Sequence, residues 1–172
     1  LYQEVERAVA PTVVIASNTS TFPLASLAGP VRLPERLVCT HFFNPVRYMR
    51  LLEVIAGEET DPEVVKFMTD FGQFLLGKGI VFGKDTPNFV ANRIGVYGIM
   101  ATVHAMIDMD YQVDEVDAIT GPAIGRPKSA TFRLGDIVGV DLMAQMGRNL
   151  RGLLAHDRVA PREETESLRR RI

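Results

Sequence analysis

The chain has 172 residues, of which 47% are hydrophobic and 23% are charged, and its formal net charge is -2. This composition predicts a globular protein with one good core or two small ones, and the near-neutral charge argues against a nucleic-acid partner. No apolar run is long enough to span a bilayer, no signal peptide is recognisable and the single Cys39 excludes an internal disulfide, so we expect a cytoplasmic protein.

Helix and strand patterns alternate in the first part of the chain. Residues 1–9 have the spacing of an amphipathic helix end, and residues 13–16 form a short apolar run that is typical of a buried parallel strand. That run leads into the polar turn at residues 17–20, a place where binding groups often lie. Residues 22–28 predict a short helix. The side chains of the first helix that we expect to lie outside are Glu4, Glu6 and Arg7.

Two further strands carry a histidine and a glutamate inside apolar runs. Residues 36–43 are mostly β-formers bounded by prolines, residues 44–45 turn the chain, and residues 48–55 form a second apolar run. His41 lies near the end of the first strand, and Glu53 interrupts the second. If these strands fold back on each other, the two side chains become neighbours, because a strand advances only about 3.3 Å per residue.

A neighbouring histidine and carboxylate suggest acid–base catalysis. A carboxylate on one ring nitrogen fixes the imidazole tautomer and favours the imidazolium, and the other nitrogen is then free to take a proton from a substrate hydroxyl. The alternative is a core histidine satisfied by a backbone carbonyl, with the side chain of Glu53 reaching out at the strand end. The pattern alone leaves both interpretations of His41 open.

A change of organisation is expected near Lys84. Before it, a helix begins at residues 60–63 and is followed by one more strand at residues 80–82. After it, only helical periodicities follow. The sequence therefore predicts an α/β domain over residues 1–84 and an all-α domain over residues 85–172. The helical segments expected in the second domain are residues 90–109, 114–120, 132–152 with a break near Gly139, and 158–172.

Five short motifs follow one another in an order and spacing that are typical of one protein family. They are SNTST at residues 17–21, HFFNP at 41–45, MRLLEV at 49–54, DTPNFVANR at 85–93 and GPAIGRP at 121–127. The chain from residue 13 to about residue 149 resembles the L-3-hydroxyacyl-CoA dehydrogenase family, and its GPAIGRPKSATFRLGDIVGVDL segment is similar to the bacterial multifunctional fatty-acid oxidation proteins. This resemblance implies a Rossmann-type NAD-binding domain, a helical domain and an NAD-dependent oxidation in fatty-acid β-oxidation.

The resemblance also implies the roles of four catalytic residues. His41 is the general base that removes the proton from the 3-hydroxyl of an L-3-hydroxyacyl-CoA while hydride passes to NAD, and Glu53 orients and polarises it. Asn92 donates a hydrogen bond to the substrate oxygen, where a neutral donor would stabilise developing charge. Ser20 hydrogen-bonds near that oxygen and the nicotinamide. The alternatives are a turn former for Ser20 and a helix-surface asparagine for Asn92.

On the cofactor side, the resemblance implies that Asn18, Ser20 and Asn44 lie close to the nicotinamide. Asn44 equally fits a residue that only shapes the turn before Pro45. No metal is implied, because neither His104 nor His156 has a ligand partner at useful spacing.

Two departures from the family pattern stand out. The junction motif commonly reads DTPGF, whereas Asn88 replaces the glycine here, and asparagine tolerates left-handed backbone geometry better than most residues. No GxGxxG occurs in the chain, although the first turn of a Rossmann fold needs one to hold the pyrophosphate. We therefore expect an incomplete fragment that lacks the first strands of the nucleotide domain and has weak or no activity alone.

The expected partners are an acyl-CoA substrate and a second copy of the chain. The resemblance implies a homodimer through the helical domain, and an apolar face with Ile94, Tyr97, Met100 and Ala101 could serve it. The alternative is that this face packs internally. An alternative function is a non-catalytic structural or dimerisation module of the same family. A third class, the β-hydroxyacid and polyol-phosphate reductases, relies on a catalytic lysine where this chain has the His41 and Glu53 pair.

Overall fold

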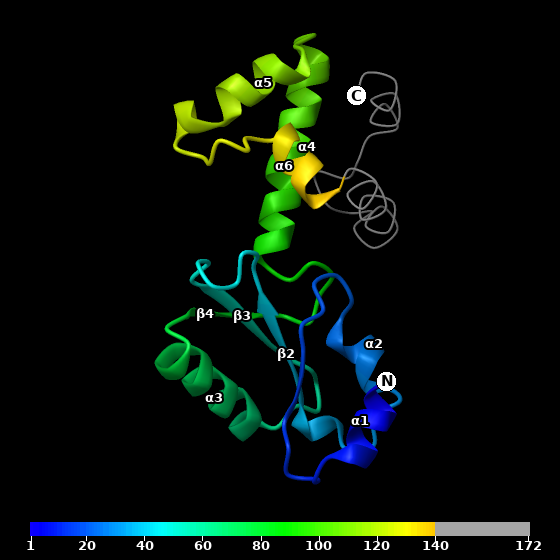
Figure 1. Ribbon diagram of the computed structural model, residues 1–172. Helices are drawn as coiled ribbons and strands as arrows, with labels where there is room; N and C mark the ends of the chain where they lie inside the picture. The colour runs from blue at the N-terminus through cyan, green and yellow to red at the C-terminus, as the bar shows by residue number, and fades with distance from the viewer. Residues whose placement is uncertain (140–172) are drawn as a thin grey trace. The chain divides into compact units, whose positions relative to one another are not determined.

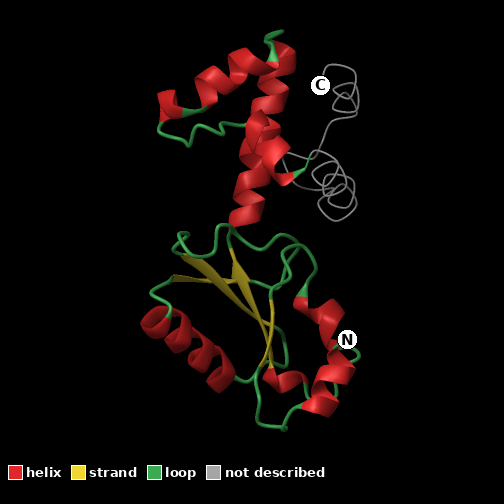
Figure 2. Ribbon diagram, viewed as in Figure 1, coloured by secondary structure: helices red, strands yellow, loops and turns green. Residues whose placement is uncertain are grey.

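The computed structural model describes residues 1–139, and the chain divides into two compact units, Leu1–Arg93 and Ile94–Ile172. In the described part of the chain, all strands belong to the first unit (Figure 2). The second unit contains helices there. The predicted order, an α/β part followed by a helical part, is confirmed. The domain boundary near Lys84 stays a prediction.

The first unit is built on one mixed sheet with the order β1-β2-β3-β4. Its strands are β1 (Ile15–Ser17), β2 (Leu37–Phe42), β3 (Leu51–Ala56) and β4 (Gly79–Gly83). The β1 strand runs parallel to β2, β2 is antiparallel to β3, and β3 is parallel to β4. The parallel strand predicted at residues 13–16 and the strand predicted at residues 80–82 are therefore confirmed, within one or two residues at their ends.

Successive residues of β2 point to opposite faces of the sheet and enter different cores. Leu37 and Cys39 pack with α1 (Tyr2–Ala8) and α2 (Leu24–Ala28), whereas Val38 packs with α3 (Pro62–Asp70). Figure 1 shows α3 on one side of the sheet and α1 and α2 on the other. Because the side-chain period of a strand is two, His41 lies on the α1 and α2 side.

The helix α1 is held to the start of β2 by a buried ion pair. Glu6 and Arg36 are 5% and 4% exposed, and Arg36 Nη2 lies 3.1 Å from Glu6 Oε1. The backbone N–H groups of Arg32 and Leu33 also donate to the Glu6 carboxylate. The prediction that Glu6 lies outside the helix packing is therefore wrong, since a distant arginine and two loop amides allow its charge to be buried.

The helix α3 begins with the signals that the sequence predicts. Asp61 caps it, with Oδ1 accepting from the backbone N–H of Glu63 at 2.8 Å, and Pro62 occupies the first turn. A π-helical turn at Phe71–Leu75 extends it toward β4. The side chains of Leu52 and Ile80 come within 2.9 Å of where a Cβ on Gly72 would lie, so this turn packs closely on the sheet.

The strand predicted at residues 48–55 begins later than expected. β3 starts at Leu51, because the backbone N–H groups of Tyr48 and Met49 both donate to the carbonyl of Pro45 and close a turn instead. The peptide bond between Asn44 and Pro45 is cis. The apolar character of Tyr48 and Met49 thus belongs to an exposed loop, with Tyr48 76% exposed.

The second unit consists of helices around a small apolar core. The helices are α4 (Ala91–Asp108), α5 (Val113–Thr120) and α6 (Phe132–Val138), with a 3-10 turn at Pro122–Ile124. Val103, Met106 and Val116 form the core. The Asp117 carboxylate accepts from the backbone N–H groups at the start of α6, which joins α5 to α6. α6 ends before Gly139, which has a φ of 102°.

The predicted helical pieces after Gly139, including residues 158–172, lie outside the described residues. Among the residues that the structure describes, no helix is long and apolar enough to cross a membrane.

Candidate active site

His41 and Glu53 face each other across the antiparallel strands β2 and β3. They are register partners, and His41 Nδ1 lies 2.6 Å from Glu53 Oε2. Their side chains are 6% and 0% exposed. The predicted proximity is confirmed, and the alternative in which Glu53 reaches out at the strand end is wrong, because the side chain is fully buried.

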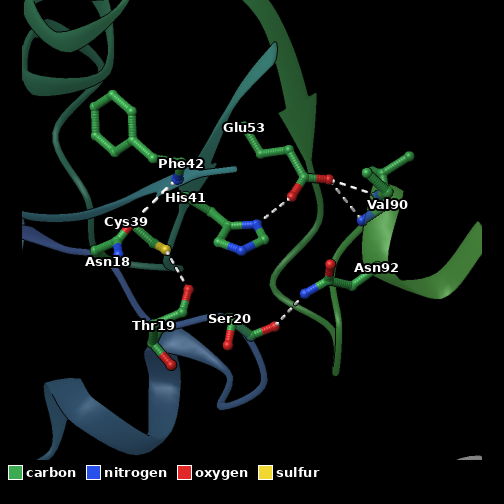
Figure 3. A network of polar contacts seen from close by, with 10 residues as sticks. Asn18, Thr19, Ser20, Cys39, His41, Phe42, Glu53, Val90 and Asn92 are labelled. Atoms are coloured by element: carbon green, nitrogen blue, oxygen red, sulfur yellow. Dashed lines mark hydrogen bonds and ion pairs between the residues drawn. The ribbon is translucent and has the colours of Figure 1, made fainter. Parts of the chain in front are cut away.

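The second oxygen of the Glu53 carboxylate is held by the backbone at the start of α4. Glu53 Oε1 accepts from the N–H of Val90 at 2.9 Å and from the N–H of Ala91 at 2.8 Å (Figure 3). The first N–H groups of a helix lack partners within it, and the helix dipole favours a negative charge at this end. Both oxygens of the buried carboxylate thus have hydrogen-bond partners, as a buried polar group requires.

The imidazole ring of His41 is held in place and keeps one nitrogen free. The ring centroid lies 4.4 Å from that of Phe43 and 5.7 Å from that of Phe89. Within residues 1–139, Nε2 makes no hydrogen bond. In Figure 3, Nε2 points to the side of the ring on which Ser20 and Asn92 are drawn. The free nitrogen is therefore directed to polar side chains from two other segments.

Ser20 and Asn92 meet at this side of the site. Asn92 Nδ2 donates to the backbone carbonyl oxygen of Ser20 at 3.4 Å, and both residues are half-buried. The Ser20 hydroxyl makes no hydrogen bond in the part of the chain that the structure describes. The structure thus brings together four residues that the sequence predicted as catalytic: His41, Glu53, Ser20 and Asn92.

Asn18 and Asn44, which the sequence predicted as cofactor contacts but not as catalytic residues, differ in their hydrogen bonds. Asn18 Oδ1 accepts from the backbone N–H of Phe42 at 3.0 Å, so it ties the turn after β1 to the end of β2. Asn44 is exposed, and its side chain makes no hydrogen bond to a described residue. The structure brings Asn18 to the strand that carries His41, but it gives Asn44 no such contact.

The thiol of Cys39 is close to the site yet chemically inert. Cys39 is fully buried, and its Sγ lies 3.5 Å from the carbonyl oxygen of Thr19. Burial, followed by the negative charges of Asp85 and Glu53, raises the pKa of the thiol to about 12. The thiolate that a nucleophile requires is therefore not formed near neutral pH.

Comparison with known proteins now places this geometry in a family. The model of the 3-hydroxyacyl-CoA dehydrogenase NAD binding domain matches residues 1–86, and that of the 3-hydroxyacyl-CoA dehydrogenase C-terminal domain matches residues 89–170. The chain belongs to the 3-hydroxyacyl-CoA dehydrogenase family. The resemblance stated from the five sequence motifs is thereby confirmed.

Two curated relatives are called probable 3-hydroxyacyl-CoA dehydrogenases. The one from Bacillus subtilis (strain 168) is 54% identical over 139 residues, which is 80% of this chain and 18% of that protein. The one from Deinococcus radiodurans is 44% identical over 159 residues, which is 91% of this chain and 46% of that protein. The chain thus spans less than half the length of either curated relative.

A solved structure supports the same fold for this 3-hydroxyacyl-CoA dehydrogenase family member. The crystal structure of (S)-3-hydroxybutyryl-CoA dehydrogenase from Ralstonia eutropha superposes with a TM-score of 0.84 at 26% identity. The match covers 98% of this chain and 60% of that one. The Rossmann-type domain followed by a helical domain, predicted from the sequence, is confirmed.

Sequence reasoning missed the backbone groups that complete the site of this dehydrogenase-family chain. The N–H groups of Val90 and Ala91 have no side-chain signature, although their place in DTPNFVANR, before a helix, was an available signal. Reasoning from the sequence also gave no role to Asp85. The Asp85 carboxylate accepts from the backbone N–H groups of Leu24 and Ala25, so it caps α2 and fixes the segment that leads to α4.

Proposed function

We propose that this site oxidises the 3-hydroxyl of an L-3-hydroxyacyl-CoA to a ketone, with NAD as the hydride acceptor, in fatty-acid β-oxidation. The observation that carries the proposal is the buried contact of 2.6 Å between His41 Nδ1 and Glu53 Oε2, which leaves Nε2 unbonded. Membership of the 3-hydroxyacyl-CoA dehydrogenase family supports it.

In the proposed mechanism, His41 acts as the general base. The Glu53 carboxylate accepts a hydrogen bond from Nδ1–H, so the lone pair of the neutral ring lies on Nε2 and can take the proton of the substrate hydroxyl. The imidazolium formed in this step is stabilised by the adjacent negative charge. The amides of Val90 and Ala91 hold Glu53 in place, so the ring is oriented before the substrate binds.

We propose that the remaining polar residues position the substrate and the nicotinamide. The Asn92 amide donates to the substrate oxygen, and the Ser20 hydroxyl, which has no partner among the described residues, supplies a second hydrogen bond there. Asn18 and Asn44 belong to the nicotinamide side. For Asn18 this role is compatible with its hydrogen bond to Phe42, because a carboxamide keeps its N–H₂ donors when its oxygen is engaged.

The residues of this site fit the nicotinamide end of NAD but not the whole cofactor. NAD, when bound, supplies the acceptor for the hydride. The turn after β1, with Asn18 and Ser20, offers polar groups beside Nε2 of His41, whereas no glycine-rich turn occurs in the sequence to hold a pyrophosphate. We therefore expect weak or no turnover from these 172 residues alone.

The proposal is tested by NADH oxidation with acetoacetyl-CoA. We would assay this chain beside a longer chain that supplies a glycine-rich strand, turn and helix ahead of Leu1, and we expect turnover from the longer chain. There His41→Gln should lower kcat by about 10² to 10⁴, the usual contribution of a general base. Glu53→Gln should also lower kcat, because a carboxamide has one accepting oxygen. The carboxylate accepts from His41 Nδ1–H with one oxygen and from the Val90 and Ala91 amides with the other.

The control is His104→Gln, which changes the other described histidine outside this site. It should leave kcat unchanged, and circular dichroism should show that each variant is folded. Full turnover by a folded His41→Gln variant would contradict the proposal. No turnover by any form would favour a non-catalytic structural module of the same family.

We further propose that residues 1–84 form the nucleotide-side domain and that residues 85–172 form the helical domain, which joins two copies of the chain in a homodimer. The exposed apolar residues Ile94 and Tyr97 of α4 support the dimer, since they are 68% and 58% exposed. The cytoplasmic location expected from the sequence stays a prediction.

A further inference from the structure

The turn after β1 carries two residues of the proposed site, yet its backbone belongs to no helix or strand. Asn18 and Ser20 lie in this turn, residues 18–21, on the way from β1 to α2. Fixing the backbone of such a segment costs conformational entropy, and contacts with other parts of the chain must offset that cost. The positions of Asn18 and Ser20 therefore depend on what holds the turn.

Contacts from β2 hold one side of the turn. Asn18 Oδ1 accepts from the backbone N–H of Phe42 at 3.0 Å, and the carbonyl oxygen of Thr19 lies 3.5 Å from Cys39 Sγ (Figure 3). Both contacts come from the strand that carries His41. They fix the turn relative to the proposed general base on this side only.

The hydroxyl of Ser17 joins the other side of the turn to α1. Ser17 Oγ accepts from Tyr2 Oη at 2.8 Å and from the backbone N–H of Thr19 at 3.3 Å. Ser17 is 5% exposed, and as the register partner of Cys39 it lies on the face of the sheet that carries His41. One buried hydroxyl therefore links a helix to the backbone of the turn.

Tyr2 is itself held in place. Its half-buried ring packs against the core that contains Ile15 and Leu24. The buried ion pair between Glu6 and Arg36 fixes α1 to the start of β2. The Tyr2 hydroxyl is thus a donor in a fixed position, and it needs no further ordering when a cofactor binds.

The alternative is that this hydrogen bond only satisfies a buried serine. The place of the bond argues for a further role, because Ser17 precedes Asn18 directly and holds the N–H of Thr19, which lies between Asn18 and Ser20. Loss of the bond would let both site residues move together. A misplacement of about 1 Å that begins away from the reacting atoms is enough to slow an enzyme strongly.

We propose that Tyr2, acting through Ser17, is a positioning residue for the oxidation proposed above. Its hydroxyl holds the turn in the conformation in which Asn18 faces the nicotinamide and Ser20 faces the substrate oxygen. The inference rests on the proposed function, since that function gives Asn18 and Ser20 their roles. Tyr2 itself touches neither the substrate nor the cofactor.

Kinetics of the longer chain test the positioning. Tyr2→Phe keeps the ring and removes the donor, and Ser17→Ala removes the acceptor. Each should lower kcat about three- to tenfold, the effect of one hydrogen bond, with little change in KM for NADH, because the pyrophosphate is held by a separate turn. The double variant should lose no more than either single variant, since all three lack the same bond. Ser17→Thr keeps the hydroxyl and should keep the kcat of the parent.

The matched control is Thr60→Val, which removes another hydroxyl of the same unit. Thr60 Oγ1 donates to the carbonyl of Leu37 at 2.7 Å, at the end of β2 opposite to His41. This variant should lower the unfolding temperature as Tyr2→Phe does, but leave kcat unchanged. An equal loss of kcat in Thr60→Val would show that loosening of the unit in general slows the reaction, and it would overturn the proposal.

Amide hydrogen exchange of this chain, followed by NMR, tests the hold on the turn without any turnover. Tyr2→Phe should speed exchange at Thr19, whereas Thr60→Val should speed exchange at Gly57, whose N–H donates to Thr60 Oγ1. Unchanged exchange at Thr19 or an unchanged kcat in a folded Tyr2→Phe variant would overturn the proposal. Faster exchange at Thr19, with no turnover by any form, would support Tyr2 as the residue that holds the turn and contradict the dehydrogenase reaction instead.

Discussion

Asn88 combines a left-handed backbone with a buried side chain that has no polar partner. Its φ is 64°, it is fully buried, and neither Oδ1 nor Nδ2 makes a hydrogen bond in the structure. The next residue, Phe89, has a φ of 46° and contacts the His41 ring. These conformations direct the following amides of Val90 and Ala91 to Glu53. Asn88 therefore belongs to the segment that positions the proposed catalytic pair.

Two substitutions at residue 88 separate its backbone from its side chain. Both Asn88→Gly and Asn88→Ala remove the unpartnered amide, but only glycine adopts this φ without steric cost. We expect Asn88→Ala to be less stable than Asn88→Gly by about 1–2 kcal/mol, the cost of a left-handed residue with a Cβ. Chemical unfolding of this chain and its two variants measures the difference.

The comparison with the parent tests the buried amide. An unsatisfied buried polar group costs about 1–3 kcal/mol, so Asn88→Gly should be no less stable than the parent despite the flexibility of glycine. Equal stability of the glycine and alanine variants would show that the left-handed backbone of residue 88 is not needed for this turn.

At the residue scale, the sequence predicts the side chains of the site better than the backbone groups that hold them in place. Two apolar runs with a turn between them were enough to predict that His41 and Glu53 are neighbours. The tolerance of asparagine for left-handed geometry correctly predicted the backbone of Asn88. The amides that hold Glu53 come from a segment 37 and 38 residues away, and local periodicity contains no information on such a contact.

At the scale of elements, α1 depends on one buried carboxylate. Glu6 Oε1 accepts from the Arg36 guanidinium and from the N–H of Leu33, and Oε2 accepts from the N–H of Arg32. Arg36 also donates to the carbonyls of Ala10 and Val13. This network joins α1, the chain after it and the start of β2. Protonation of the Glu6 carboxylate should therefore affect how α1 is held.

The stability of this network should depend on pH. The hydrogen bond from the Arg32 N–H, together with those from Arg36 and Leu33, lowers the pKa of Glu6 below its usual 4.5, although burial acts in the opposite direction. The charged form is thus favoured by folding. Its contribution to stability is present above pH 4.5 and is lost as the pH falls toward the lower pKa of the folded state.

Glu6→Gln tests this dependence. The variant should be less stable than the parent at pH 7, because it leaves the buried Arg36 charge unpaired, and the difference should shrink as the pH falls below 4.5. Denaturation midpoints between pH 3 and pH 7 measure it. Glu4→Gln on the same helix is the control, since Glu4 is 77% exposed, and it should show little change. A Glu6→Gln deficit that is constant across this range would contradict the lowered pKa.

Elements were predicted well where local signals define them and less well where distant contacts do. The cap at Asp61 and the proline after it correctly started α3. Residues 48–50 were predicted as the start of a strand, but they belong to a loop whose carbonyls at Val46 and Met49 accept from Lys78, 29 residues or more away. Glu6 was placed outside for the same reason, because its partner Arg36 lies 30 residues away.

At the scale of the whole molecule, the helical unit presents apolar residues on α4. Ile94 and Tyr97 are separated by three residues, so they lie on one face of the helix, and Ala101 follows on the same face. Among the described residues of its own unit, this face is not covered, since Ile94 and Tyr97 are 68% and 58% exposed. Large exposed apolar residues of this kind often mark an interface between protein chains.

If this face joins two copies of the chain, charged residues there should separate them. We expect light scattering to give twice the 19.0 kDa of one chain for the parent, and 19.0 kDa for Ile94→Asp/Tyr97→Asp. In a two-fold interface each substitution acts on both copies, so four carboxylates would have to be buried without partners, which is strongly unfavourable.

The exposed Phe82 of β4 provides the matched control for the dimer. It is 63% exposed and belongs to the other unit, so Phe82→Asp adds a charge to an exposed apolar residue and leaves the sequence of α4 unchanged. Phe82→Asp should keep the mass of the dimer. A parent of 19.0 kDa would exclude the homodimer for this chain, and dissociation by Phe82→Asp rather than by the α4 variant would move the interface to the sheet edge. The edge of a sheet offers unpaired backbone groups to a second copy, which is why that outcome is the physical rival of the helical interface.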